Sequence, residues 1–261
     1  MRIKRSGAAG WSVWLTRLGP LLALGALLAV AAGMGLGPFA RSQGLTFTNT
    51  PLVSFGSPSE SAPAPLPAFV NLPVPFTSQA PKGEWSASQH DCEEASLAMV
   101  DRYLRGDRSG GLIDPDAAEA AIRGMTPWKV SQDLVPSQLG LMAREHLGWS
   151  YRIYAATPAN IKQQIALGRP VIVGVLTHGL GNPAYPGYRD HYEQPDWSVS
   201  HFVVVTGYDA SSAILNDPGI NQGHGYHISF SQLFYAITDL GRAYPNLDAG
   251  LVVLVLAPGV A

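Results

Sequence analysis

The segment Asp91-Cys-Glu-Glu-Ala-Ser-Leu-Ala-Met99 contains the only cysteine of this 261-residue chain. Small and apolar residues recur there at steps of three and four positions, at Cys92, Ala95, Met99 and Tyr103. This spacing predicts a helix over residues 92–104. Asp91 occupies the N-cap position, and Glu94, three positions later, gives the segment the form of a capping box. The pattern therefore predicts that Cys92 is the first residue of a helix.

A thiol at a helix start lies beside unpaired backbone N–H groups and the positive end of the helix dipole, which both stabilise a thiolate. The same N–H groups can stabilise an oxyanion. Asp91, Glu93 and Glu94 oppose a thiolate, so we expect a histidine to complete an ion pair with Cys92. A single cysteine leaves no intramolecular disulfide, redox pair or cysteine zinc site. The alternative role for Cys92 is that of a small buried apolar residue.

His201 is the histidine that best fits this role, because it opens the strongest strand pattern of the chain, residues 201–208. A turn at residues 209–212 and a second strand ending before Asp217 predict a hairpin that returns Asp217 toward His201. In a regular turn Ile220 would lie opposite His201, so the contact requires twist, a bulge or a tighter turn. A structural histidine at 201 and a turn-forming Asp217 are the alternatives, and His90 is a reserve base.

The remaining periodicities predict helices before strands. Helices are expected at Pro115–Arg123, Pro136–His146, Pro158–Leu167 and Phe230–Ile237. Strands are expected at Val171–Leu176, His201–Tyr208, Ala213–Asn216 and Leu251–Leu256. A helical part followed by a sheet is the order of an α+β domain.

Three regions follow one another along the chain. Arg2, Lys4, Arg5 and Arg17 precede an uncharged run from Leu18 to Ala40, so residues 1–40 are expected to be a signal peptide or a single transmembrane anchor. Residues 41–68 are rich in Pro and Ser and predict a linker. Residues 69–261 are expected to form one domain. The predicted location is extracytoplasmic, either membrane-anchored or secreted.

Composition excludes several classes of partner. The net charge of −2, with 17 Lys and Arg, predicts no nucleic-acid binding. The chain contains no GxxxxGK[ST] phosphate loop, so no nucleotide is expected. The remaining histidines stand without an HExxH pattern, so neither a metal nor another cofactor is expected.

Several segments in this order resemble the bacteriocin-leader-processing, double-glycine peptidase-like domains, a group related to cysteine peptidase family 39. They are Leu72–Gln79, Trp85, Asp91–Met99, Gly168–Gly174, Ser200–Asp209 and Leu215–Gly219. The resemblance implies a papain-like fold, with the nucleophile helix of an N-terminal helical part packed on a C-terminal antiparallel sheet. It also implies a triad of Cys92, His201 and Asp217, with Gln79 as an oxyanion donor.

Together these features predict an extracytoplasmic cysteine peptidase that hydrolyses bonds in a peptide or protein substrate. An amidase or acyltransferase acting on cell-envelope material, or an inactive binding module of the same fold, is the alternative. Similar domains that mature bacteriocins act from the inner side of the membrane and continue into an exporter and a nucleotide-binding domain. Their double-glycine substrate is therefore not expected here.

Overall fold

A computed structural model describes residues 65–130, 133–180, 198–220, 222–245 and 252–258, which belong to one compact unit, Glu60–Ala261. The apolar run at residues 18–40 and most of the predicted linker lie outside these ranges. Within the described ranges, no helix has both the length and the apolar character needed to cross a membrane.

The described strands form one seven-stranded sheet in which every pairing is antiparallel. Its order is β2-β7-β3-β4-β5-β6, and β1 pairs with β4. The strands are β1 (Val70–Asn71), β2 (Trp149–Ala155), β3 (Val171–Leu176), β4 (Ser200–Tyr208), β5 (Ser212–Asn216), β6 (Tyr226–Ser229) and β7 (Val252–Pro258). The central strands β3 and β4 are almost wholly buried, which explains their continuous rather than alternating apolar sequence.

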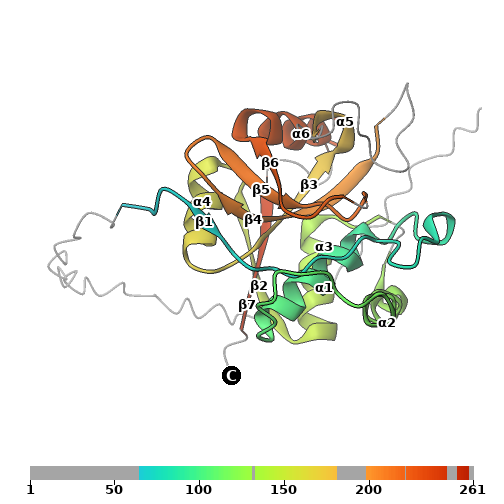
Figure 1. Cartoon of the computed structure of the whole chain (residues 1–261). Coiled ribbons are helices and arrows are strands. Elements are labelled where there is room, and N and C mark those ends of the chain that lie inside the picture. Colours follow the sequence, from blue (N-terminus) through green and yellow to red (C-terminus); the bar gives the residue numbers. More distant parts are fainter. Residues whose placement is uncertain (1–64, 131–132, 181–197, 221, 246–251, 259–261) are drawn as a thin grey trace, which may run out of the picture. The chain divides into compact units, whose positions relative to one another are not determined.

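Helices are placed before and between the strands (Figure 1). They are α1 (Cys92–Leu104), α2 (Pro115–Met125), α3 (Pro136–Met142), α4 (Pro158–Ala166), α5 (Thr177–Leu180) and α6 (Phe230–Ala243). Short 3₁₀ turns at Trp85–Ala87 and Thr126–Trp128 and a π-helical turn at Ala143–Leu147 complete the described helical elements.

The two faces of the sheet form two hydrophobic cores. Ile172, Phe202 and Val204 pack in the core that includes residues of α1, α2 and α3. The alternating residues Val203 and Val205 pack in a second core with residues of α4 and α6. Because successive side chains of a strand point to opposite faces, β4 is held between two layers of helices. Figure 1 shows α1, α2 and α3 on one side of the sheet and α6 on the other.

The expected α+β class with an antiparallel sheet is confirmed, although β1 precedes α1, and α4, α5 and α6 lie between strands along the chain. The helix at 92–104 and the strand at 171–176 have the predicted bounds, whereas α6 continues six residues past the predicted end at Ile237. The sequence reading omitted β2 and β6. These strands are largely solvent-facing or short, so neither shows a long apolar run.

The predicted capping box at the start of α1 is wrong. Asp91 makes no side-chain cap hydrogen bond, and its Oδ2 lies 3.0 Å from Nη1 of Arg123 on α2. Glu94 turns away from the N-cap, and its Oε2 lies 3.1 Å from Nζ of Lys129. Both carboxylates thus find a cation from another element, which local sequence spacing cannot show.

Candidate active site

Cys92 is the first residue of α1 and lies against the edge of β4. Phe202 is paired with Gly174 of β3 on one side, and because pairing between β4 and β5 begins only at Val204, its other side is left for contact with α1. The carbonyl oxygen of Phe202 accepts a hydrogen bond from Oγ of Ser96 at 3.3 Å, and the Phe202 backbone lies close enough to the Cys92 sulfur to lower the pKa of the thiol. These contacts fix the start of the helix beside the first residues of the strand. Cys92 is 7% exposed there.

His201 and Asp217 are in direct contact. Nε2 of His201 lies 2.7 Å from Oδ1 of Asp217, and both side chains are buried. The pairing of β4 with β5 shifts between Val205 and Gly207, so that Thr206 is an extra residue and forms a bulge. A bulge is one of the three geometries, together with twist and a tighter turn, that the sequence requires for a contact between His201 and Asp217.

Asp217 is itself held by three neighbours. Its Oδ1 accepts the backbone N–H of Gly219 at 2.9 Å, and its Oδ2 accepts the hydroxyl of Tyr226 at 3.1 Å. Its own backbone N–H donates to the carbonyl of Gly223 at 2.8 Å. The carboxylate that orients His201 is therefore fixed on both oxygens. Tyr226 was not among the expected site residues, because its contact depends on how β6 pairs with β5.

Gln79 is brought to the same place by the loop after β5. Its backbone N–H donates to the carbonyl of Pro218 at 2.9 Å, and Pro218 is the residue directly after Asp217. Its side-chain Nε2 donates to the carbonyl of Ser88 at 2.7 Å, while Oε1 is buried without a partner among the described residues. The hydrogen bond to Ser88 thus fixes the orientation of the Gln79 amide group. Nε2 carries a second N–H that this bond does not use.

One cavity of about 250 Å³ brings three of the predicted residues together. Gln79, Cys92 and His201 all line it, and Asp217 contacts His201 through the ring nitrogen Nε2. The other lining residues are Gln89, His90, Asp133, Ser198, Val199, Ser200 and Tyr244. His90, the reserve base, has Nδ1 at 3.0 Å from Oδ1 of Asp133.

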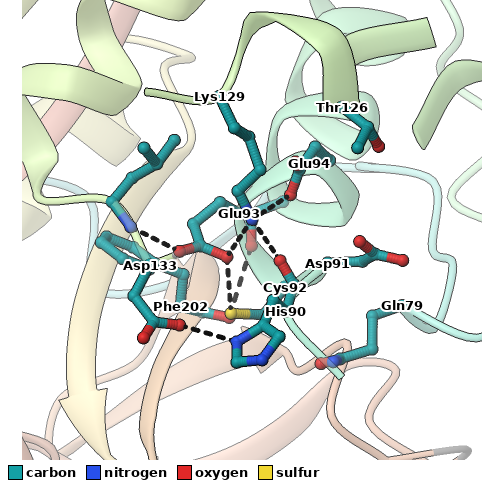
Figure 2. A network of polar contacts seen from close by, with 12 residues as sticks. Gln79, His90, Asp91, Cys92, Glu93, Glu94, Thr126, Lys129, Asp133 and Phe202 are labelled. Carbon is teal, nitrogen blue, oxygen red and sulfur yellow. Dashed lines mark hydrogen bonds and ion pairs between the residues drawn. The ribbon is translucent and has the colours of Figure 1, made fainter. Parts of the chain in front are cut away.

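A buried charge cluster next to Cys92 was missed by the sequence reading (Figure 2). Lys129, which follows the 3₁₀ turn at Thr126–Trp128, has its Nζ 3.5 Å from Oε2 of Glu93 and 3.1 Å from Oε2 of Glu94. Lys129 also donates to the carbonyl of His90. The signal that could have revealed it is two adjacent acids in an apolar helix, since buried carboxylates need a cation.

Burial and these charges alter the acidity of the groups around the sulfur. Burial raises the pKa of the Cys92 thiol well above its usual range, and the Glu93 carboxylate raises it further, whereas the Phe202 backbone and Lys129 lower it. Burial also raises the pKa of Glu94 to about 7. The helix start by itself therefore does not make Cys92 a thiolate.

A thiol, an imidazole oriented by a buried carboxylate and an amide N–H around one cavity form the set of groups that acyl transfer requires. The thiol can attack a carbonyl, the imidazole can move its proton, and the amide can donate to the oxygen that becomes negative. His201 presents Nε2 to Asp217, so Nδ1 is the nitrogen that can exchange a proton with Cys92.

The chain is similar to several solved structures and matches the model of one sequence family. No curated protein matches the chain significantly. A putative C39-like peptidase from Bacillus anthracis is 16% identical with a TM-score of 0.49, covering 74% of this chain and 99% of that one. A double glycine motif protease from an AMS/PCAT transporter, solved with its leader peptide, is 18% identical with a TM-score of 0.38, covering 65% and 86%. Xylellain, a cysteine protease from Xylella fastidiosa, is 15% identical with a TM-score of 0.33, covering 76% and 88%.

The chain also matches the model of a sequence family. The model of the Peptidase_C39 like family matches residues 71–240, a range that includes Gln79, Cys92, His201 and Asp217. The α+β class with an antiparallel sheet, expected from the sequence, agrees with the described structure. Because this match extends over more than half of the chain, the chain belongs to the Peptidase_C39 like family.

Proposed function

We propose that this protein is a cysteine peptidase that hydrolyses peptide bonds, with Cys92 as nucleophile, His201 as general base and acid, and Asp217 orienting His201. The observation that carries the proposal is the 2.7 Å contact between His201 and Asp217 at the cavity that Cys92 also lines. An imidazole held on one nitrogen by a buried carboxylate keeps one tautomer and one orientation.

The reaction proceeds by two acyl transfers. The thiol proton of Cys92 moves to Nδ1 of His201, and the sulfur attacks the carbonyl carbon of the substrate. The imidazolium then gives this proton to the leaving amine, and a thioester remains on Cys92. A water molecule, deprotonated by His201, attacks the thioester; the C–S bond breaks, the acid is released, and the imidazolium returns its proton to the Cys92 sulfur. Asp217 stabilises the imidazolium that forms in each step.

Gln79 supplies a hydrogen bond to the oxyanion. One N–H of its Nε2 is used by the carbonyl of Ser88, and the second is the donor in this proposal. The backbone N–H of Cys92, at the start of α1, is the second donor. Removing one such donor costs about 3 kcal/mol of transition-state stabilisation in known acyl-transfer enzymes.

The test combines active-site labelling with product analysis on the full chain. Because Cys92 is the only cysteine, a peptidyl thiol-directed probe has one possible site, and Cys92→Ala is the blank. We expect wild-type protein to cleave an unstructured protein substrate into defined peptides, and Cys92→Ala and His201→Ala to leave it intact. Unchanged cleavage in His201→Ala contradicts the proposal.

The products also separate hydrolysis from the alternative chemistries. We expect free carboxylates at the new C-termini in mass spectra, even when an amine acceptor is added. Predominant amide products would assign an acyltransferase, and release of ammonia from side-chain amides would assign an amidase. A folded protein that binds peptide without any cleavage would be an inactive binding module.

We also propose that the domain acts outside the cytoplasmic membrane. Support comes from the basic residues Arg2, Lys4, Arg5 and Arg17 before the uncharged run Leu18–Ala40. A protease added to intact cells should degrade the domain if the run is an anchor, and N-terminal sequencing of secreted protein should locate a cut if it is a signal. Protection of the whole chain until the cells are lysed contradicts this location.

A further inference from the structure

The proposed reaction makes no use of the buried charges beside its nucleophile. The side chains of Glu93, Glu94 and Lys129 are 2%, 0% and 9% exposed, and they form a compact group at the base of α1 (Figure 2). Burying three charges costs free energy unless they are paired and hydrogen-bonded. A buried carboxylate next to a catalytic thiol therefore needs an explanation beyond stability.

Glu93 contacts Cys92 directly. Sγ of Cys92 donates a hydrogen bond to Oε2 of Glu93 at 3.1 Å, and Oε1 of Glu93 accepts the backbone N–H of Leu134 at 2.8 Å. Both carboxylate oxygens are thus held in place, and the acceptor cannot easily move away from the thiol. A hydrogen bond from sulfur to a carboxylate requires the proton to be on sulfur. This geometry favours the neutral thiol over the thiolate.

The charges around the sulfur act in opposite directions. Lys129 favours a thiolate, but it is shared between two carboxylates, so the group as a whole does not offer Cys92 a net positive charge. His201 supplies the site to which the thiol proton can move. The titratable groups that line the cavity beside Cys92 are His90, Asp133, His201 and Tyr244. Next to them lie the charge group of Glu93, Glu94 and Lys129, the pair of Asp91 with Arg123, and Asp217 behind His201.

We propose that Glu93 is a positioning residue that holds Cys92 as a neutral thiol in the substrate-free protein, so that the thiolate forms only when the sulfur leaves Glu93 and passes its proton to His201. The proton moves from Sγ to Nδ1 of His201, and no other bond changes. The inference rests on the proposed role of Cys92 as nucleophile, and it makes thiolate formation dependent on substrate. Unproductive oxidation and alkylation of the only cysteine are then slow in the resting protein.

The ultraviolet absorbance of the thiolate, followed against pH, tests the resting state in the wild-type protein. Since Cys92 is the only cysteine, the signal has one source once a Cys92→Ala baseline is subtracted. We expect thiolate only at or above the ordinary thiol range of about pH 8.5. A thiolate already formed at neutral pH overturns the inference, whatever the variants do.

Glu93→Gln tests the residue itself. The amide removes the charge and can donate to a thiolate, so we expect a lower thiol pKa and alkylation by iodoacetamide about tenfold faster at neutral pH, which corresponds to one pKa unit. Glu94→Gln is the matched control, because Glu94 shares Lys129 but makes no contact with the Cys92 sulfur among the described interactions. Equal effects of the two substitutions, or no effect of Glu93→Gln, overturn the inference.

Glu93→Asp covers the case in which Glu93→Gln does not fold, as judged by circular dichroism and thermal melting. The aspartate keeps the negative charge, but its side chain is one CH₂ shorter and reaches the Cys92 sulfur less well. We therefore expect a thiol pKa between that of the wild type and that of an ordinary thiol. A wild-type pKa in Glu93→Asp would contradict the role given to the contact between Glu93 and Cys92. The proposed function can fail separately. Loss of cleavage in His201→Ala with an unchanged Glu93→Gln titration rejects only the inference, and a shifted titration without any peptide cleavage rejects only the function.

Discussion

Oδ1 of Asp217 lies 2.7 Å from Nε2 of His201, although a regular hairpin would place Ile220 opposite His201. Two local irregularities make the contact possible. The bulge at Thr206 shifts the pairing by one residue, so that Val204 pairs with Asn216. The chain then leaves β5, and Asp217 accepts the N–H of Gly219 in a tight turn. The pair therefore depends on backbone geometry as much as on the two side chains.

Replacing Asp217 by Asn tests the role of its charge. The amide can keep a hydrogen bond to His201, but it cannot stabilise an imidazolium in a buried site. We expect kcat/KM for peptide hydrolysis to fall by about 100-fold or more, with little change in KM. Steady-state kinetics on a cleaved peptide measure this. The control is the melting temperature, and activity within a few-fold of wild type would contradict the role given to Asp217.

Gly223→Ala tests the backbone that holds Asp217. A Cβ at position 223 would stand 1.8 Å from the carbonyl oxygen of Asp217, so the turn must shift. We expect a loss of about 1–3 kcal/mol in the free energy of unfolding, measured by denaturant, together with reduced cleavage.

Gly124→Ala is the matched control for that substitution. Gly124 lies in α2, and an added Cβ there meets no atom within 4 Å. Because alanine favours helix over glycine, we expect a gain of about 0.5–1 kcal/mol and unchanged cleavage. Similar losses in both variants would show that Gly223 has no special place in the structure.

Gln79→Ala removes the proposed side-chain donor to the oxyanion. We expect kcat to fall by about 100-fold while iodoacetamide still alkylates Cys92 at the wild-type rate, because alkylation forms no oxyanion. Gln89→Ala is a suitable control, since Gln89 lines the same cavity. An equal loss in both variants would assign the effect to the shape of the cavity instead of to a hydrogen bond from Gln79.

Glu94→Gln should change how stability depends on pH. The pKa of Glu94 is raised from 4.5 to about 7, so the folded protein binds more protons than the unfolded chain between these values. Its contribution is therefore fully present below pH 4.5 and is lost as the pH rises through about 7. Relative to Glu94→Gln, the wild type should lose about 3 kcal/mol of unfolding free energy over this range. Parallel denaturation curves for the two proteins at every pH would contradict this.

Local sequence patterns were sufficient for the elements that position the site. Three- and four-residue spacing located α1 and placed Cys92 at its first residue, and β-branched runs located β3 and β4. Patterns failed where an element has one exposed face or is short, as in β2 and β6. They also failed at Asp91, whose carboxylate pairs with Arg123 on another helix instead of capping its own.

Residue patterns alone identified the candidate chemical groups: a cysteine at a helix start, a histidine near the start of one strand and an aspartate directly after the next strand. The environment of these groups follows from contacts between distant parts of the chain. The bulge at Thr206 brings Asp217 to His201, and the packing of Lys129 against α1 makes Glu93 and Glu94 a buried charge group. The reason is physical, because hydrogen-bond partners and desolvation depend on distances between segments far apart in the chain, and residue spacing encodes only the distances within one element.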